Sequence, residues 1–396
     1  MAAASEAGAA TPWSWGRLAR IAGLAVVVLL LTDATLRGKE EEMSRAAADG
    51  GLRNRDGAAS ADACERMLFE LPRDQVAQAV VFVGSSVSYG SNLSAREALP
   101  AQLASLWRAE GKRRPVFNCA QEGGRPESAL SVAAALDSHP VALVLMEIMV
   151  PVYVERSQPP PPPWSEGEIA LLQAARPAGR ARLEAAGLWP RWPARVESLL
   201  TRLVRAHWRL YRIRGGLWID EDMAPDQLAW TARRAAAAAQ VLPKRFHGQT
   251  TNVGKLPWRE AYVGGQRPSL VQHFRVPTAR VSEPDYGALP VLRDLLIEAN
   301  VPVLFYEIPI NLPFQREFSL MSEDEIDRLA RVRTLLLERM AKDELPILAA
   351  PEMPDEGFLD KAHLTPKGAA RLARHLRGPA EALLDTSGSP DLRAGS

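Results

Sequence analysis

Cysteine is scarce in this sequence: Cys64 and Cys119 are the only two among 396 residues. Neither lies in a Cys-x-x-Cys pair or at ligand spacing from a histidine, which argues against a zinc site and against a disulfide scaffold. A single Cys64–Cys119 bridge stays open if the protein is exported. The simpler interpretation is that Cys119 is a small apolar residue within a strand.

A surplus of either charge is also absent. The chain has 48 Lys and Arg against 47 Asp and Glu, a formal net charge of +1, so nothing favours a polyanionic partner and we predict no nucleic-acid binding. A phosphate-binding loop is missing too, because the stretch Gly84–Gly90 lacks the lysine that would reach a phosphate. The sequence therefore predicts neither a metal nor a cofactor.

Long apolar runs are limited to one short candidate near the amino terminus. The uncharged run Ile21–Thr32 falls below the ~17–25 residues of a spanning helix, but a few flanking residues bring it close. Basic residues before it favour a cytoplasmic start. We predict an uncleaved transmembrane signal-anchor at residues 21–36 after a cytoplasmic segment at residues 1–20. A cleaved signal peptide would look similar. Either would place the rest outside the cytoplasm, on the periplasmic or cell-surface side.

The remaining chain is long enough for one large domain with additions, or for two domains. Apolar residues make up 47% and charged residues 24%, which is ordinary for a folded core. We predict a polar linker at residues 37–70, one domain at residues 71–386 and a disordered tail at residues 387–396. An insertion at about residues 152–285 interrupts the domain.

Apolar, strand-like runs alternate with helix-like segments on both sides of that insertion. The predicted strands are residues 79–83, 115–120, 141–150, 301–308 and 345–349. The clearest predicted helices are residues 289–300, 323–342 and 366–384. This alternation predicts an open, mostly parallel α/β sheet. In such sheets ligands bind beyond the carboxyl ends of the strands.

The insertion has a different composition. It contains a proline run, Pro159–Pro163, that is typical of a stiff polyproline spacer, and then becomes rich in Arg, Ala and Trp. Arginines recur through residues 191–218 with Trp208 and Tyr211 between them. This pattern fits a helix that contacts a membrane surface, but also a helical cap whose leucines face the core. Whether the insertion is a lid or a docking surface stays open.

Two distant stretches carry groups for serine acyl transfer. The run Val80–Gly90 predicts a buried strand leading into a glycine-flanked turn that presents Ser86. Near the far end, Asp360 precedes His363 by three residues. A hydroxyl becomes a good nucleophile when a base takes its proton, and the base needs a third group to fix its tautomer. Ser86, His363 and Asp360 are the candidates for these three positions.

The combination resembles the SGNH/GDSL hydrolase family. The matching blocks are Gly84-Ser85-Ser86 with Gly90, then Asn118 with Gly123, and finally Asp360-Lys361-Ala362-His363. The resemblance covers roughly residues 76–151 and 286–385. It implies a three-layer α/β/α sandwich of the SGNH, flavodoxin-like kind, with a mostly parallel sheet.

The resemblance also implies roles for these residues. Ser86 would be the nucleophile, His363 the general base and acid, and Asp360 the group that orients it. The backbone N–H groups of Ser86 and Gly123 would be oxyanion donors, which meet charge that develops only in the transition state.

Two departures from the family pattern stand out. Ser85 replaces the usual Asp, as in membrane-anchored members of the family. The third block, normally Gly-x-Asn-Asp, should fall near residues 149–152, where the sequence reads Met-Val-Pro-Val, so its oxyanion asparagine is missing. Asn311, after the fourth strand, is a candidate replacement, although it also fits a turn residue before Pro313.

Two carboxylates, Glu147 and Glu307, each fall near the end of an apolar strand, where an unpaired charge is costly to bury. Each could line the pocket or pair with a buried arginine.

Together these features predict a membrane-anchored, extracytoplasmic SGNH-type serine esterase or O-acyltransferase. It would act through an acyl-enzyme on ester-linked acyl groups, with cell-envelope glycans as candidate substrates and a membrane-bound O-acyltransferase as candidate partner. The alternative is a non-catalytic SGNH-fold scaffold or carbohydrate-binding protein, which the missing third-block asparagine would suit.

Overall fold

The structure is a computed structural model of the chain. It describes residues 73–91, 96–121, 126–153, 166–190 and 288–386, together with single residues outside these ranges. The predicted tail lies outside the described residues, and so does the arginine-rich stretch except for residues 196 and 200. Of the predicted linker only Cys64 and Leu68 are described.

A five-stranded sheet with the order β2-β1-β3-β4-β5 forms the centre of the molecule. The strands are β1 (Val80–Val83), β2 (Val116–Asn118), β3 (Leu143–Ile148), β4 (Val303–Glu307) and β5 (Ile347–Leu348). All neighbouring strands pair in parallel. The predicted parallel α/β sheet is therefore confirmed, and its strand order is the flavodoxin-like one.

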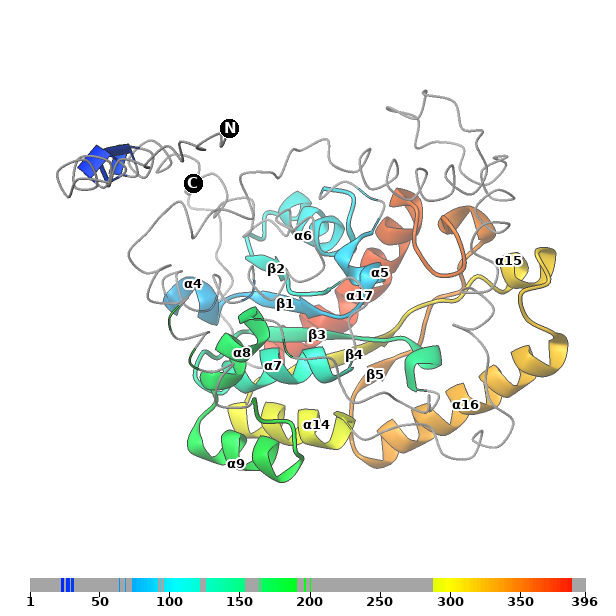
Figure 1. Cartoon of the computed structure of the whole chain (residues 1–396). Coiled ribbons are helices and arrows are strands. Elements are labelled where there is room, and N and C mark those ends of the chain that lie inside the picture. The colour runs from blue at the N-terminus through cyan, green and yellow to red at the C-terminus, as the bar shows by residue number, and fades with distance from the viewer. Residues whose placement is uncertain are drawn as a thin grey trace, which may run out of the picture.

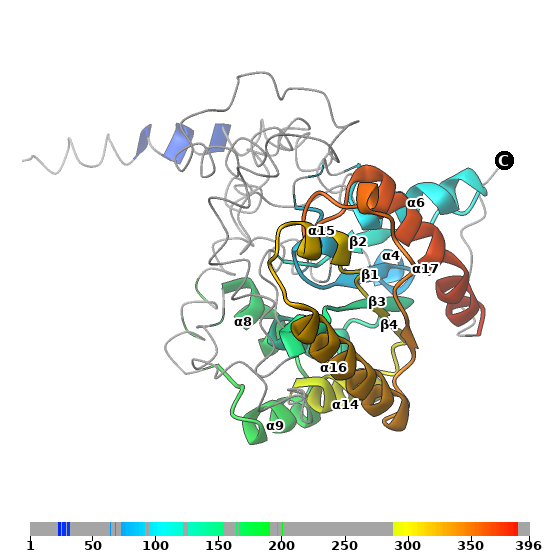
Figure 2. The same cartoon turned by 90° about the vertical axis from the view of Figure 1, so that its right-hand side faces the viewer.

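Helices cover both faces of this sheet (Figures 1 and 2). One face carries α7 (Pro126–Leu136), α14 (Ala288–Ala299) and α16 (Glu323–Lys342). The other carries α6 (Leu99–Ala109) and α17 (Pro366–Thr386). Because parallel strands are buried on both faces, they read as continuous apolar runs. The helices on both faces leave every residue of β1, β2 and β3 buried.

Side chains of β1 alternate between the two faces, as the pleat of a strand requires. Val81 and Val83 belong to the core beneath α7, α14 and α16. Val80 and Phe82 belong to the core beneath α6 and α17. The strand is thus fixed from both sides, and so is the chain that leaves its carboxyl end.

The helices of the carboxyl-terminal half begin where the sequence predicts. Ser322 and Glu325 form a capping box at the start of α16, with each side chain bonded to the other's backbone. Helix α17 begins at Pro366, and the hydroxyl of Thr365 accepts a hydrogen bond from the N–H of Gly368 at 3.2 Å. Pro suits this first helical position because its missing N–H would have no partner there.

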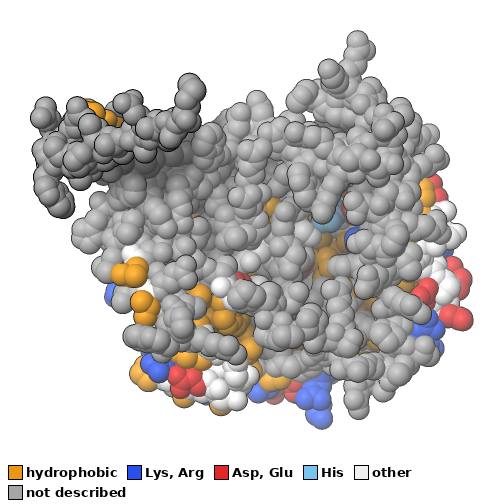
Figure 3. Space-filling model, viewed as in Figure 1, with side chains coloured by type: hydrophobic (Ala, Val, Ile, Leu, Met, Phe, Trp, Pro, Cys, Tyr) orange, Lys and Arg blue, Asp and Glu red, His pale blue; other side chains and the backbone are white. Residues whose placement is uncertain are grey.

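The described start of the insertion is helical. Helices α8 (Glu166–Gln173) and α9 (Pro177–Ala185) follow the short 3₁₀ helix η1 (Val150–Tyr153). Helix α8 packs on α7 and α9 packs on α14. Acidic and basic side chains gather over α9 and along α16 in the space-filling view (Figure 3).

Part of the predicted anchor is described and is helical: Gly23, Leu24, Val26–Val28, Leu30 and Leu31. Within the described part of the chain, no helix has both the length and the apolar character needed to cross a membrane.

Candidate functional site

Ser86 lies at the carboxyl end of β1, where the turn expected from the sequence is a short helix, α5 (Ser86–Tyr89). Ser85 is its N-cap, and its hydroxyl accepts a hydrogen bond from the N–H of Val87. Gly90 ends the helix in the left-handed region, with a φ of 80°. A glycine is favoured there because side chains with a Cβ rarely adopt this conformation. The two glycines that flank the serines thus serve a tight strand-to-helix turn.

His363 is held in a loop between the 3₁₀ helix η4 (Asp355–Gly357) and α17. Phe358 and Leu364 form an antiparallel bridge across this loop, and the N–H of Leu359 donates to the carbonyl of His363 at 2.7 Å. Asp360 Oδ1 accepts from the N–H groups of Ala362 at 3.0 Å and His363 at 2.9 Å. The loop is therefore rigidly tied around the Asp360 carboxylate.

The fold brings Ser86, His363 and Asp360 into one hydrogen-bonded chain. His363 Nε2 lies 2.9 Å from Ser86 Oγ, and His363 Nδ1 lies 2.8 Å from Asp360 Oδ2. Asp360 is 4% exposed. Burial alone would raise the pKa of Asp360, but the neighbouring His363, the N–H of Ala362 and the charge of Lys361 together hold it well below its usual range.

This geometry fixes the tautomer of His363. An ionised Asp360 only accepts hydrogen bonds, so His363 Nδ1 carries the proton. Nε2 is then the lone-pair nitrogen, and it faces the hydroxyl of Ser86. A hydroxyl facing a neutral imidazole that is oriented by a carboxylate is the arrangement in which proton abstraction activates a serine.

Of the two expected oxyanion donors, the N–H groups of Ser86 and Gly123, the structure describes only that of Ser86. Ser86 is the first residue of α5, so its N–H has no acceptor within the helix, and among the described residues it has no other acceptor. Gly123 lies outside the described residues. Within the described part of the chain, the Ser86 N–H is therefore open to a ligand's oxygen.

Asn311 is fully buried and its side chain is occupied. Its amide donates to Asp355 Oδ1 at 2.7 Å and to the carbonyl of Asp360 at 3.1 Å, and it caps α15 (Leu312–Glu317) by accepting from the N–H of Phe314. Both amide hydrogens thus have partners, and the structure does not support Asn311 as an oxyanion donor. It serves as a turn residue that fastens the Asp360 loop.

Glu147, near the end of β3, contacts the serine turn itself, a relation that sequence reasoning missed. Its Oε1 accepts from the hydroxyl of Ser85, and its Oε2 accepts from the hydroxyl and the N–H of Ser88. Burial raises the pKa of Glu147, and the hydrogen bonds from Ser85 and Ser88 oppose that rise. The only sign of this contact in the sequence is that Ser85 and Glu147 both lie near the carboxyl ends of predicted parallel strands.

Glu307, at the end of β4, has the other expected partner. Arg333 of α16 forms a bidentate ion pair with the Glu307 carboxylate, and the N–H of Ala350 donates to the same carboxylate at 2.9 Å. Glu307 therefore joins β4, α16 and the segment after β5, a structural task rather than a chemical one.

Both cysteines are buried free thiols in the same core. Burial, and then a hydrogen bond with Cys64, raise the pKa of the Cys119 thiol. A raised pKa keeps the thiol protonated and unreactive, so Cys119 acts as a small core residue at the end of β2.

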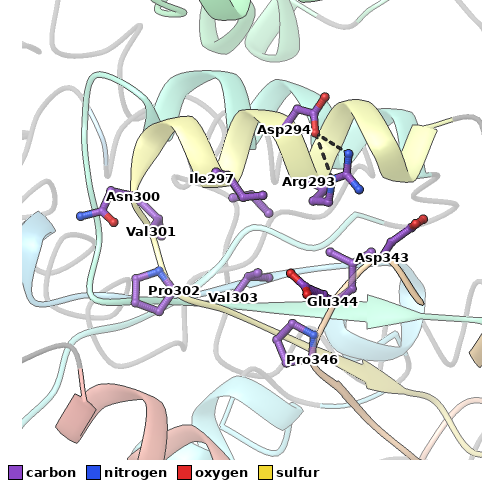
Figure 4. Close-up of a pocket in the computed structure, with 12 residues that line it drawn as sticks. Arg293, Asp294, Ile297, Asn300, Val301, Pro302, Val303, Asp343, Glu344 and Pro346 are labelled. Carbon is purple, nitrogen blue, oxygen red and sulfur yellow. Dashed lines mark hydrogen bonds and ion pairs between the residues drawn. The ribbon is translucent and has the colours of Figure 1, made fainter. Parts of the chain in front are cut away.

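A groove lies at the opposite edge of the sheet, where β4 and β5 begin (Figure 4). It has a volume of about 610 Å³ and runs between α14 and the segment before β5. Its charged lining includes Arg293 and Asp294, which pair with each other at 2.9 Å. Asp343 and Glu344 also line the groove, but Ser86, His363 and Asp360 do not.

Comparison with known proteins finds a distant likeness among solved structures. No family model matches the chain, and no curated protein matches it. Among solved structures it is similar to a carbohydrate acetylesterase family member from Sinorhizobium meliloti, with 10% sequence identity and a TM-score of 0.30. The match covers 78% of this chain and 99% of that one. So distant a likeness transfers no function to this chain.

Proposed function

We propose that this protein is a serine esterase or O-acyltransferase of the SGNH kind that works through an acyl-enzyme. The observation that carries the proposal is the chain of hydrogen bonds from Ser86 through His363 to Asp360. These residues come from opposite ends of the sequence and meet at the carboxyl edge of a parallel sheet, where ligands bind in such folds.

The chemistry follows from the three positions. His363 Nε2 takes the proton of Ser86 while Oγ attacks the carbonyl carbon of an ester. The carbonyl oxygen becomes an oxyanion, which the N–H groups of Ser86 and Gly123 are proposed to stabilise. Collapse of this intermediate expels the alcohol, which takes the proton from His363, and leaves an acyl group on Ser86.

The second half of the reaction decides between the two activities. His363 removes a proton from the acceptor, which attacks the acyl-enzyme and releases Ser86 with its proton restored. Water as acceptor gives a hydrolase, and a sugar hydroxyl gives a transferase. The resemblance to membrane-anchored SGNH proteins favours ester-linked acyl groups of cell-envelope glycans as substrates, and a membrane-bound O-acyltransferase as partner.

The proposal includes an amino-terminal membrane anchor and an extracytoplasmic site. Six large apolar side chains of the helical segment, from Leu24 to Leu31, are each more than half exposed to solvent. Exposed apolar clusters of this kind are typical of surfaces that contact a membrane or a partner. Protease protection of the full chain in intact cells tests this orientation.

Acyl-enzyme formation is testable with p-nitrophenyl acetate and the full-length protein in detergent. We expect a burst of nitrophenol equal to the enzyme concentration, followed by slower turnover. Ser86→Ala should abolish the burst, whereas Ser131→Ala, which changes a buried serine on α7, should keep it. The absence of a burst in folded wild-type protein would argue against the proposal.

One observation favours a second candidate, a non-catalytic carbohydrate-binding or scaffold protein. Residues 149–152 contain no asparagine, and the amide of Asn311 is fully used. Such a protein would bind acetylated glycans equally well with alanine at Ser86 and would release no acyl group from them.

A further inference from the structure

The short helix that begins with Ser86 is held at both ends by buried side chains of neighbouring strands. At its amino-terminal end, Glu147 of β3 accepts hydrogen bonds from Ser85 and Ser88. At its carboxyl-terminal end, the amide of Asn118 donates to the carbonyls of Ser88 and Tyr89, each at 3.2 Å. A four-residue helix cannot hold its own shape, so these strand residues determine where Ser86 lies.

Glu147 occupies an unusual position for a buried carboxylate. It is 6% exposed and lies on a central strand, where a charge is costly without a partner. Its acceptors are instead matched by donors of the serine turn, two hydroxyls and one N–H. Tyr306 of β4 extends the network by bonding to the hydroxyl of Ser88.

The backbone is built to let Glu147 approach. A Cβ at Gly84 would lie 2.5 Å from both Cβ and Oε2 of Glu147, closer than real carbon atoms come. Any other residue at Gly84 would therefore force Glu147 or the serine turn to shift. The glycine after β1 makes room for this carboxylate.

A helix leaves its first N–H groups without internal acceptors, and a negative charge near them is favourable. The N–H of Ser88 is one of these groups, and it bonds Glu147 at 3.0 Å. The N–H of Ser86 is another, and it points from the same turn without an internal acceptor. Glu147 thus orders one donor of the turn while leaving the proposed oxyanion donor available.

We propose that Glu147 is a positioning residue for the nucleophile, which holds Ser86 Oγ and the Ser86 N–H in reacting geometry by capping α5 from the neighbouring strand. In this role it supplies the carboxylate that Ser85 does not carry. The inference deepens the proposed function and rests on it for its kinetic consequence, whereas its structural part stands independently.

The test compares Glu147→Gln with Glu307→Gln in the full-length protein. Both replace a buried carboxylate at the end of a central strand, but only Glu147 contacts the serine turn. We expect Glu147→Gln to slow fluorophosphonate labelling by about 10²-fold, the size of effect that a 1 Å misplacement produces. Glu307→Gln should label at close to the wild-type rate even if its melting temperature falls.

Rescue separates positioning from loss of packing. In Ser85→Asp/Glu147→Gln the carboxylate returns at the N-cap, where Asp is among the preferred residues. We expect this double variant to label faster than Glu147→Gln, and Ser85→Asp alone to label more slowly than wild type because two carboxylates then meet. A double variant no faster than Glu147→Gln would contradict the proposal.

Hydrogen exchange makes the test independent of catalysis. In Glu147→Gln the amides of Val87 and Ser88 should exchange faster, with the other strands and helices unchanged. If Glu147→Gln does not fold, Ser88→Ala provides a milder test, because it removes the hydroxyl bond to Glu147 and keeps the N–H bond. Failure of wild type to label, with faster exchange in the variant, would reject the proposed function and keep the positioning role. Exchange in α5 as slow as in wild type would overturn the inference about Glu147.

Discussion

His363 Nε2 lies 2.9 Å from Ser86 Oγ although 277 residues separate them in the chain. The contact exists because β1 delivers Ser86 to one edge of the sheet and the loop before α17 returns His363 to the same edge. Each end is fixed by its own network, Glu147 and Asn118 around the serine, and Asn311 and Asp360 around the histidine. Changes in the two networks should therefore differ in their effects on the rate of serine labelling and on the stability of the fold.

Asp360→Asn should slow serine labelling strongly, although Ser86 and His363 themselves are unchanged. An amide at this position can donate to Nδ1, which favours the wrong tautomer of His363 and moves its proton to Nε2. For a catalytic triad the expected loss is about 10⁴-fold. Labelling rates of wild type and Asp360→Asn at equal extents of folding measure the effect. Equal rates would mean that Asp360 does not set the tautomer.

The depressed pKa of Asp360 also predicts an acid dependence of stability. The unfolded carboxyl has a pKa near 3.9, and the folded one lies well below it. A lowered pKa stabilises the folded state above the unfolded value, and this contribution is lost as the pH falls through the folded value. Wild type should therefore lose more stability than Asp360→Asn below about pH 4. Parallel curves in denaturant titrations from pH 6 to 2 would contradict this.

Two glycines of α17 should differ in their response to alanine. A Cβ at Gly368 would lie 2.0 Å from the carbonyl oxygen of Gly357, whereas a Cβ at Gly378 would meet nothing within 4 Å. Gly368→Ala must push η4 and the histidine loop away, which should lower the free energy of unfolding by about 1–3 kcal/mol. Gly378→Ala should stay within about 1 kcal/mol of wild type, because the gain in helix propensity is offset by the proline that follows. Thermal unfolding of the two variants decides the matter.

Asn311→Ala should lower both stability and labelling together. The change removes the amide that donates to the half-buried Asp355 and to the buried carbonyl of Asp360, and losing the partner of a buried polar group costs about 1–3 kcal/mol. An oxyanion donor would behave differently, since its removal slows reaction without destabilising the fold. Chemical denaturation alongside labelling separates the two roles. Unchanged stability with a large loss of rate would restore Asn311 as a transition-state donor.

Much of the fold could be predicted because apolar runs in central parallel strands are long and unbroken. The sequence predicts a helix at residues 323–342, and the structure has α16 at Glu323–Lys342. Strand β5 was predicted at residues 345–349 but pairs only over Ile347–Leu348. A short edge strand leaves little signal, because one neighbour alone determines its extent.

The contacts around Glu147 could not be predicted from the sequence. A carboxylate at a strand end could as easily pair with an arginine, and Glu307 does so with Arg333. The difference depends on side-chain reach across neighbouring strands and on the missing Cβ of Gly84. The same holds for Asn311, whose partners Asp355 and Asp360 come from a loop 44 to 49 residues away.

The central claim is that Ser86 is an activated nucleophile. The most direct measurement is mass-spectrometric mapping of the adduct formed when the full-length protein reacts with a fluorophosphonate, beside Ser86→Ala and His363→Ala. The account predicts one phosphonate per chain on Ser86 in wild type and no adduct in either variant, with all three proteins folded. A folded wild-type protein without an adduct, or with the adduct on another serine, would contradict it.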